Sequence, residues 1–523
     1  MFLFIFFLGL LSVLSPAYAE TPPVVTETTF ADDAASKELS GFYALRGKAA
    51  AWNLSDETSI QKAQAFVNSV EALIAYHGLE KSQYQLDNLR QLIAAPTDEN
   101  KKKLEFAISQ SLLHLAHDLH GDNHNLAALY PGWSFHRSAA DIPALLNKAI
   151  TQGTLETFFD KIAPQNPAYR NLTAALQIYR EIESKGGWSN ITLGAPLRPQ
   201  DKNERVGQLR ARLAAEGYLP SPTAEQNDVF DSELEHALIS YQARNGLQAD
   251  GHAGAKTQEA LNVPIATRLN QIIANMERWR HMPDDFPPQR NTIINIPDFT
   301  ITITEDGALI YQGIVVDGRI DRATPFISSK ITNMMVNPSW HVPLKIARKD
   351  ILPKLQKDST YLEKQGIVIA GREEDPSGTT IDWKKVKPAK FSYLLRQNPS
   401  DMNSLGQLKF NFLNPFDVYM HGTPHQELFA KAERSFSSGC VRLEEPEAVA
   451  EILLMHNKDK EVWSKERIEA EIASEKTHLV MLAKPMPVYF VYWSVFAGSD
   501  GLINFRKDIY GYDDVLINKM KGH

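Results

Sequence analysis

The hydrophobic period of this chain changes near Asn291, and this change constrains its fold more than any other feature. Before it, apolar residues recur at helical spacing, as in residues 60–74, 104–119 and 172–182. After it, residues 292–296 and 299–304 alternate with period two and are rich in β-branched side chains. The sequence therefore predicts a multidomain α+β protein, with helices in its first half and mostly strands in its second.

The helical half, residues 35–200, is predicted to be a scaffold, and nothing in it demands catalysis. One stretch has the residue types of a metal site: His114, His117, Asp118, His120 and His124. Its first two histidines alternate with leucines, and Gly121 signals a helix end before the last one. We favour a partly buried helix that ends in polar histidines over a metal site.

Residues 205–264 are predicted to form a compact unit of three helices. Glycines after the second helix allow the third to begin within a few residues. The pair Tyr241-Gln242 and the run from Asp250 to Leu261, which reads D-G-x-x-G-x-x-T-x-x-A-L, resemble a small peptidoglycan-binding domain. The alternative is a packing module without a ligand, because the matching residues serve the fold more than a ligand.

The β half, residues 291–515, is predicted to be one domain whose sheet is interrupted by an inserted subdomain at residues 342–399. The insertion has a helical stretch at 352–362 and turn-forming residues at 373–378. Strands resume at 407–412 and 417–420. An apolar run at 487–496, with a partner at 501–509, is expected to close the sheet.

The beginning of the chain favours export. Residues 1–14 are apolar except for Ser12, and Ala17-Tyr18-Ala19 has the small-x-small form of a cleavage site, so residues 1–19 are predicted to be a signal peptide. No Lys or Arg precedes the apolar run, which leaves an uncleaved inner-membrane anchor as the alternative. We expect a protein that acts outside the cytoplasm. A formal net charge of -8 provides no basic footprint for nucleic acid.

The single cysteine, Cys440, has no partner for an internal disulfide, so it is either incidental or kept for its reactivity. It lies in Ser437-Ser438-Gly439-Cys440-Val441-Arg442, nineteen positions after His421. A strand-end histidine can take the proton of a thiol that lies on a glycine-rich turn. Taken singly, each residue is better explained by packing or polar satisfaction. Together they favour a nucleophile and its base.

Neighbouring residues have chemistry that would support such a pair. Gly439 allows a bend in which the amides of Gly439 and Cys440 can form an oxyanion hole. Arg442 can favour the thiolate, orient a substrate carboxylate, or brace the loop through backbone carbonyls. The carbonyl of Gly422 is the best available group to orient the imidazole. A rival zinc site made of His421, His425 and Cys440 is disfavoured because Pro424 prevents a regular helix.

The sequence H-G-T followed by S-x-G-C-V-R resembles the catalytic signature of the L,D-transpeptidases of bacterial cell walls, the YkuD-type domain. Five further segments resemble the larger Gram-negative members called YcbB-like: Asn337 to Trp340 with Val342-Pro343, Asp350 to Lys354, Leu394 to Gln397, Leu405-Gly406 and Lys409-Phe410. Those members have a helical scaffold, a peptidoglycan-binding domain and a capped catalytic sheet. The resemblance therefore covers nearly the whole chain after the leader.

This resemblance implies roles for individual residues. Cys440 would be the nucleophile and His421 the proton donor and acceptor, with Gly422 as the backbone partner of the imidazole. The amides of Gly439 and Cys440 would bind the oxyanion. Substrate would be bound by Tyr419, Trp340, Arg442 and Ser438. Core packing is the alternative for Trp340 and Tyr419. No metal and no cofactor are expected.

The implied reaction joins peptidoglycan stem peptides in the periplasm. A tetrapeptide donor would lose its terminal D-alanine, and a diaminopimelate-containing acceptor would complete the cross-link. The resemblance also implies acylation by carbapenems. We expect a monomer that can work with cell-wall synthesis partners. An L,D-carboxypeptidase, which resolves the thioester with water, and a non-enzymatic wall-binding protein are the alternatives.

Overall fold

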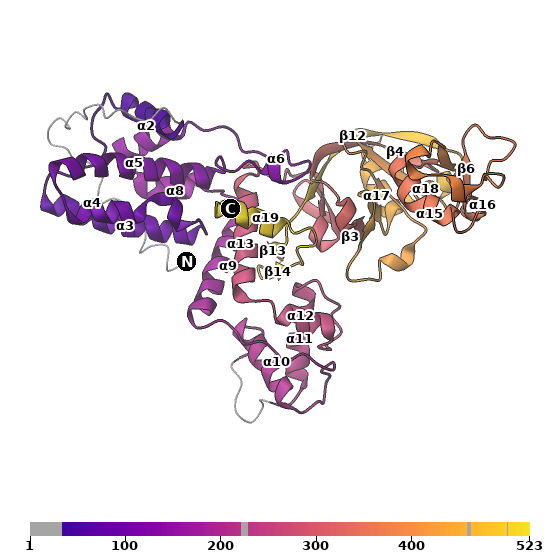
Figure 1. Ribbon diagram of the computed structural model, residues 1–523, viewed down its shortest axis with the longest axis horizontal. Helices are drawn as coiled ribbons and strands as arrows, with labels where there is room; N and C mark the ends of the chain where they lie inside the picture. Colours follow the sequence, from indigo (N-terminus) through magenta and orange to yellow (C-terminus); the bar gives the residue numbers. More distant parts are fainter. Residues whose placement is uncertain (1–33, 221–227, 458–461, 499, 523) are drawn as a thin grey trace. The chain divides into compact units, whose positions relative to one another are not determined.

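The computed structural model describes residues 34–220, 228–457, 462–498 and 500–522 (Figure 1). They fall into two compact units. The first contains the described residues of Met1–Leu129, Phe135–Phe286 and Ser494–His523, and the second contains those of Tyr130–Ser134 and Pro287–Trp493. The predicted signal peptide at residues 1–19 lies outside the described residues. None of the helices in the described ranges is both long and apolar enough to span a bilayer.

The scaffold part of the first unit is helical, as the sequence predicts. The three periodic stretches lie within α3, α5 and α9. Polar side chains cap each of these helices, since Asp56, Thr97 and Asn166 all accept from first-turn amides. The helices are α2 Ala34–Leu45, α3 Glu57–Tyr76, α4 Leu86–Ala94, α5 Asp98–His120, α6 Leu126–Leu129, α7 Ile142–Thr151, α8 Leu155–Ile162 and α9 Pro167–Ser184.

The predicted end of α5 is confirmed. Gly121 caps it in the left-handed conformation at φ +87°. A Cβ at this position would lie 2.4 Å from the backbone oxygen of Arg280, so only glycine allows this close approach. The helix therefore stops before His124, as the sequence indicates.

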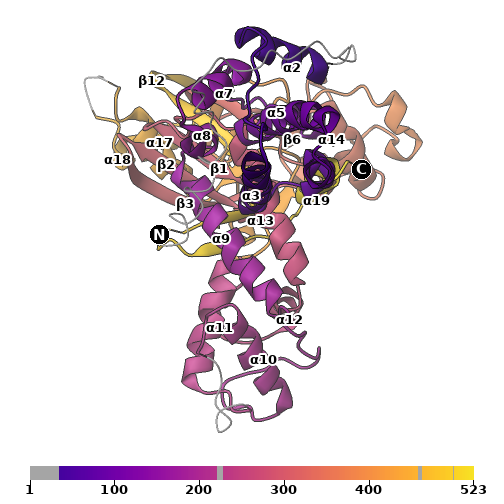
Figure 2. The same cartoon turned by 90° about the vertical axis from the view of Figure 1, so that its left-hand side faces the viewer.

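The C-terminal segment belongs to the first unit, which differs from the prediction. Helix α13 (Ile265–Arg280) lies beside α9 (Figure 1, Figure 2). The strands β13 (Val495–Ala497) and β14 (Ile503–Phe505) form a separate two-stranded sheet, and α19 (Tyr512–Met520) packs on α13. Residues 501–509 therefore do not close the sheet of the second unit, which ends at Trp493 rather than near residue 515.

Buried polar contacts explain why the C-terminal segment packs in the first unit. The guanidinium of Arg278 lies 2.6 Å from the carboxylate of Asp513, and both side chains are almost fully buried. Asn275 donates to the hydroxyl of Ser494 at 2.7 Å, and this hydroxyl donates to Asp513 at 2.7 Å. A buried ion pair of this kind is strongly destabilised when one partner is removed. Its partners are far apart in the sequence, so periodicity could not reveal it.

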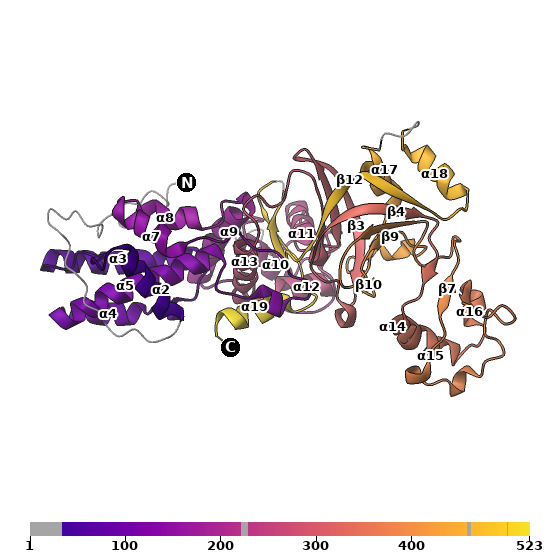
Figure 3. The same cartoon turned by 90° about the horizontal axis from the view of Figure 1, so that it is seen from above.

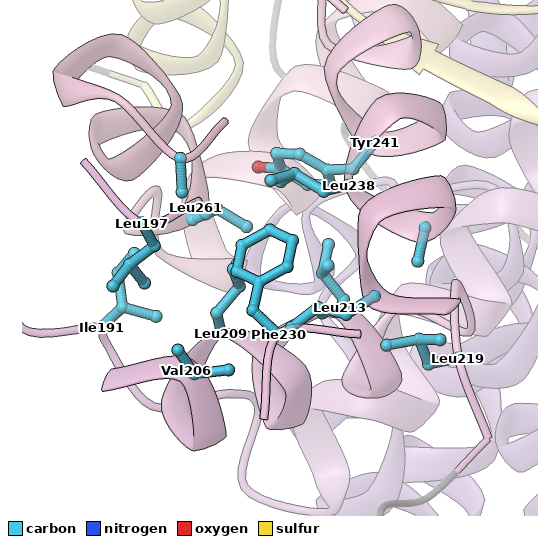
Figure 4. Packing of buried hydrophobic residues seen from close by; sticks show 13 residues of the cluster. Ile191, Leu197, Val206, Leu209, Leu213, Leu219, Phe230, Leu238, Tyr241 and Leu261 are labelled. Carbon is cyan, nitrogen blue, oxygen red and sulfur yellow. The ribbon is translucent and has the colours of Figure 1, made fainter. Parts of the chain in front are cut away.

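Three short helices pack around one apolar core between residues 191 and 261: α10 Glu204–Ala215, α11 Ser232–Arg244 and α12 Ala255–Leu261 (Figure 4). The side chain of Gln242 is buried and donates to Asp250, to the carbonyl of His252 and to Thr257. Its oxygen accepts from the amide of Gly251 at 2.9 Å. The signature residues thus hold the turn between α11 and α12 together, as the packing interpretation expects.

The second unit is built on a nine-stranded sheet with the order β10-β3-β11-β9-β8-β4-β12-β1-β2. Because β3 also pairs with β2, the pairings close into a ring. Helices α17 (Pro446–Leu454) and α18 (Lys465–Ala473) follow β11 in the chain. The strands are β1 Asn291–Asn295, β2 Thr300–Glu305, β3 Ala308–Gly318, β4 Ile327–Val336, β8 Leu408–Phe412, β9 Met420–His421, β10 Ser435–Ser437, β11 Val441–Leu443 and β12 His478–Val491.

The inserted subdomain has its own apolar core around Trp383 and Phe391. Figure 3 shows α14, α15, α16 and β7 grouped together beyond the strands of the main sheet. The expected helix at 352–362 is broken into two single turns, and three short strands form a second sheet in the order β5-β7-β6. The elements are β5 Trp340–His341, α14 Leu344–Ile346, the π-helix Ala347–Ile351, α15 Leu352–Leu355, α16 Tyr361–Lys364, β6 Ile367–Ile369 and β7 Leu395–Gln397.

Candidate active site

Three neighbouring strands place one row of cationic and imidazole side chains on the same face of the sheet. Lys409 of β8 is in register with His421 of β9, and His421 is in register with Arg442 of β11. Cross-strand partners point to the same face, so these three side chains share it. The next row, Phe410, Met420 and Val441, is completely buried on the opposite face. The apolar row anchors the strands that carry the polar one.

His421 is buried and has a fixed tautomer. Its Nδ1 lies 2.5 Å from the carbonyl oxygen of Gly422, which can only accept, so Nδ1 is the protonated nitrogen. Nε2 therefore keeps its lone pair. Burial and the charge of Arg442 lower the pKa of His421 to about 3. At neutral pH the imidazole is neutral and can act as a base.

The backbone turn behind His421 leaves no room for a side chain at Gly406. Gly406 has φ +60°, and a Cβ there would lie 2.7 Å from the carbonyl carbon of Gly422. The buried amide of Asn403 holds this turn, because its oxygen accepts from the amide of Leu405 at 2.8 Å and its nitrogen donates to the carbonyl of Pro338 at 2.9 Å. The carbonyl that orients the imidazole is thus backed by a turn that requires glycine.

The loop that carries Cys440 is held by hydrogen bonds within the loop and by one from the connection between β3 and β4. The hydroxyl of Ser437 lies 2.5 Å from the carbonyl oxygen of Cys440, and the amide of Gly439 donates to that hydroxyl at 3.0 Å. Thr324, which is fully buried, donates to the carbonyl of Gly439 at 3.0 Å. Gly439 has φ +112°, a conformation that side-chain-bearing residues rarely adopt.

These bonds modify the predicted oxyanion hole. The Gly439 amide already has an acceptor in Ser437, so it is not a free donor in this structure. The amide of Cys440 has no hydrogen-bond acceptor among the residues that the structure describes. Of the two predicted donors, only the Cys440 amide is therefore available for an oxyanion without a rearrangement.

The thiol of Cys440 is partly exposed and is neutral in this state. Burial raises its pKa, whereas Tyr419, Lys409 and Arg442 lower it by smaller amounts. Its Sγ is 3.9 Å from the carbonyl oxygen of Asp417. Cys440 and Tyr419 directly precede the paired residues Val441 and Met420, so both enter the site from adjacent strands.

Two aromatic residues that the sequence associated with the substrate lie beside the thiol. The hydroxyl of Tyr419 interacts with both Cys440 and Trp340, and burial followed by Cys440 raises the pKa of this phenol. The ring centroids of Tyr419 and His421 are 5.6 Å apart. Neither Tyr419 nor Trp340 is fully buried, which core packing alone would require.

Two cations lie near the thiol. Sequence reasoning gave no role to Lys409 and left several roles open for Arg442. The ammonium of Lys409 lies 3.9 Å from the centroid of the Tyr419 ring. Lys409 appeared in the sequence only as part of a family segment, and its strand register is the signal that places it here. For Arg442, the structure contains no hydrogen bond to a backbone carbonyl within the described ranges, so the loop-bracing interpretation has no support.

A further cation links the loop of Cys440 to the insertion. The guanidinium of Arg322 donates to Asp350 of the π-helix through both Nη atoms and to the hydroxyl of Ser438 at 2.8 Å. Ser438 is therefore already bonded to protein, although the sequence assigned it to substrate. Arg322 and Asp350 carry no motif that would have identified this pair.

The family model described as the L,D-transpeptidase catalytic domain, YkuD, matches residues 289–462. This chain contains an L,D-transpeptidase catalytic domain. Ahead of the transpeptidase domain, a "Putative peptidoglycan binding domain" matches residues 202–261 and a "Scaffold domain" matches residues 37–176. The three matches follow the order that the resemblance implied.

One curated relative of this chain is a Haemophilus influenzae protein named "Putative L,D-transpeptidase". It is 34% identical over 276 residues, which are 51% of this chain and 54% of that protein. The chain thus matches about half the length of this relative.

Crystal structures of L,D-transpeptidases from Xylanimonas cellulosilytica and Stackebrandtia nassauensis are 13% and 15% identical to this chain. They cover 57% and 58% of it, and 99% and 96% of their own chains. Their TM-scores of 0.19 and 0.21 are too low to support an argument.

Two histidine clusters have the residue types of metal sites, and a histidine of each contacts nearby carboxylates instead. In the scaffold domain, His117 contacts Glu38 and Asp122, and the hydrogen bond to Asp122 contributes most to raising its pKa to about 9. In the transpeptidase domain, His425 is exposed and lies 3.4 Å from Glu427. The described residues contain no group of three His, Cys, Asp or Glu side chains arranged to hold a metal ion.

Proposed function

We propose that this protein is a cysteine L,D-transpeptidase that cross-links peptidoglycan stem peptides in the periplasm. The observation that carries this proposal is the neutral, buried His421, whose Nδ1 is bonded to Gly422 and whose strand β9 pairs with β11, the strand that directly follows Cys440. The matched catalytic domain and the matched peptidoglycan-binding domain support the substrate class.

In the proposed first step, Sγ of Cys440 attacks the carbonyl carbon of the L,D amide before the terminal D-alanine, while Nε2 of His421 takes the thiol proton. The tetrahedral intermediate collapses when the C–N bond breaks, and His421 returns the proton to the leaving amine. The products are a thioester on Cys440 and free D-alanine. A neutral thiol and a neutral imidazole are the expected resting pair, because burial disfavours both charged forms.

In the second step, an amine of another stem, such as that of diaminopimelate, attacks the thioester, and His421 accepts its proton. The C–S bond breaks, the thiol is restored and an amide cross-link is formed. The free amide of Cys440 is the proposed oxyanion donor. Gly439 would join it only after its amide leaves the Ser437 hydroxyl, which is 3.0 Å away in the resting structure.

Carbapenems are proposed to acylate the same thiol, because a strained β-lactam carbonyl meets the same nucleophile. Intact-mass measurements should detect one adduct on the wild type and none on Cys440→Ala. An adduct on both proteins would exclude Cys440 as the nucleophile.

The reaction itself is tested with a purified disaccharide-tetrapeptide and mass spectrometry, using Cys440→Ala as the control. A dimer that lacks one D-alanine and depends on Cys440 would establish the transpeptidase. Tripeptide without dimer would point to an L,D-carboxypeptidase. Unchanged substrate, together with binding to isolated sacculi by both proteins, would favour a wall-binding protein.

Export is proposed from residues 1–19, and periplasmic fractionation of the full chain tests it. Recovery in the cytoplasm would contradict the proposal. Recovery with the inner membrane, with the leader still attached, would indicate an anchor.

A further inference from the structure

We propose that Lys409 is a specificity-determining residue, which binds the terminal carboxylate of the acyl-donor stem and selects anionic donors. This inference rests on the proposed function, since it names the group that recognises the donor at the same site. Lys409 is absent from the sequence-based assignment of the site.

The position of Lys409 places its charge next to the reacting atoms. It is in register with His421 and shares the face on which Tyr419 and Cys440 lie. Its ammonium is 3.9 Å from the centroid of the Tyr419 ring. The hydroxyl of the same ring interacts with the Cys440 thiol, and Lys409 also interacts electrostatically with this thiol. A ligand bound to the ammonium is therefore adjacent to Cys440.

The ammonium of Lys409 has no carboxylate partner. Within the described ranges it makes no ion pair and no hydrogen bond, although its side chain is only partly exposed. Burial lowers the pKa of this ammonium, and the Cys440 thiol is the one group that opposes the shift. A desolvated cation without a counter-charge is costly, and such sites gain free energy when an anion binds.

The chemistry of the proposed donor supplies such an anion. The terminal D-alanine has a carboxylate that is separated from the scissile carbonyl carbon only by the amide nitrogen and Cα. When that carbonyl lies at Sγ of Cys440, the carboxylate lies within the reach of a flexible lysine side chain beside the thiol. A lysine ammonium is a point charge that suits a carboxylate whose position changes as the leaving group departs.

The decisive experiment compares two donors, a disaccharide-tetrapeptide with a free terminal carboxylate and the same molecule with a terminal carboxamide. We expect the wild type to prefer the acid by about tenfold in kcat/KM, as for a hydrogen bond to a charged group. Lys409→Met should lower this ratio to about 1 by losing activity on the acid alone, while Lys409→Arg keeps the preference. Equal losses on both donors would overturn the proposal, because a thiolate-stabilising or structural lysine would act on both.

A matched control is Lys354→Met, which removes another lysine ammonium from a tyrosine ring, here 5.0 Å from the Tyr361 centroid. It should leave the acid-to-amide ratio unchanged.

Equilibrium binding separates this proposal from the proposed function. The two donors are titrated into Cys440→Ala and into Cys440→Ala with Lys409→Met. A preference of about tenfold for the acid that disappears with Lys409 supports the carboxylate site even if the wild type forms no cross-link. Equal binding of acid and amide to Cys440→Ala overturns it even if the wild type is an active transpeptidase.

Discussion

The guanidinium of Arg322 forms a two-armed ion pair with the carboxylate of Asp350, and its Nη2 is 2.8 Å from Oδ1. Arg322 precedes β4 of the main sheet, whereas Asp350 belongs to the inserted subdomain. The same guanidinium donates to Ser438, which is two residues before Cys440. One buried side chain therefore connects the insertion to the loop of the candidate nucleophile.

Asp350→Asn should loosen this connection. We expect it to lower the free energy of unfolding by about 2 kcal/mol, less than for a fully buried pair because Asp350 is partly exposed. Hydrogen exchange should increase at residues 435–443 as well as around Asp350. Lys364→Met, which removes the exposed ion pair with Asp358 in the same insertion, is the control and should cost less than about 0.5 kcal/mol. Unchanged hydrogen exchange at residues 435–443 would show that Arg322 does not couple the insertion to the loop of Cys440.

Cys440 should react slowly with a neutral alkylating agent at pH 7. Burial raises the pKa of its thiol, so the thiolate fraction is lower than for free cysteine. Iodoacetamide trapping as a function of pH, read by intact mass, measures this directly. Alkylation faster than that of free cysteine at pH 7 would indicate a preformed thiolate and imidazolium instead.

The pH profile of acylation should extend far into the acid range. Because the pKa of His421 is lowered to about 3, the base remains neutral and active down to about pH 4. A stopped-flow measurement of carbapenem acylation between pH 4 and pH 8 would test this. An acid limb centred near pH 6.5, the usual range for histidine, would contradict the arrangement described here.

Gly406→Ala should impair the site more than an equivalent change elsewhere. Gly406 and Gly366 both have φ +60°, but a Cβ at Gly406 would meet the Gly422 backbone at 2.7 Å, whereas Gly366 has open space around it. Both substitutions incur about 1 kcal/mol of left-handed strain, and only Gly406→Ala adds a clash behind His421. We expect acylation to fall at least tenfold in Gly406→Ala and to be unchanged in Gly366→Ala. Equal acylation rates in the two variants would show that close packing of the Gly406 turn on Gly422 is not needed.

The stability of the first unit should depend on pH through His77. Its imidazole is buried, its Nδ1 is 2.9 Å from the Tyr169 hydroxyl, and burial lowers its pKa to about 3. The unfolded chain protonates first, so this contribution is complete above about pH 6.5 and decreases by about 1.4 kcal/mol per pH unit down to about pH 3. Urea unfolding at pH 5 and pH 7 should therefore differ less in His77→Gln than in the wild type. Equal differences in both proteins would contradict the assignment.

Local sequence patterns predicted most of the element types, and they put forward His421 and Cys440 as a base and a nucleophile. Helical and strand periods are local properties, and they identified α3, α5, α9 and the strands around Asn291. Glycine-rich turns and the residues beside the nucleophile are local as well. The fold class, with helical and mostly-β parts, is confirmed by the structure and by the family matches.

The distant residues that meet in the fold could not be read from local patterns. The register of β8 on β9 brings Lys409 to His421, and the ion pair between Arg322 and Asp350 crosses from one subdomain to another. The pairing of Arg278 with Asp513 returns the C-terminal segment to the helical unit, which sequence periodicity had assigned to the sheet. Each contact depends on strand order, on which face a side chain occupies and on burial of a charge beside its partner. Those properties arise only when segments far apart in the chain pack together, because local propensity carries no information about the partner.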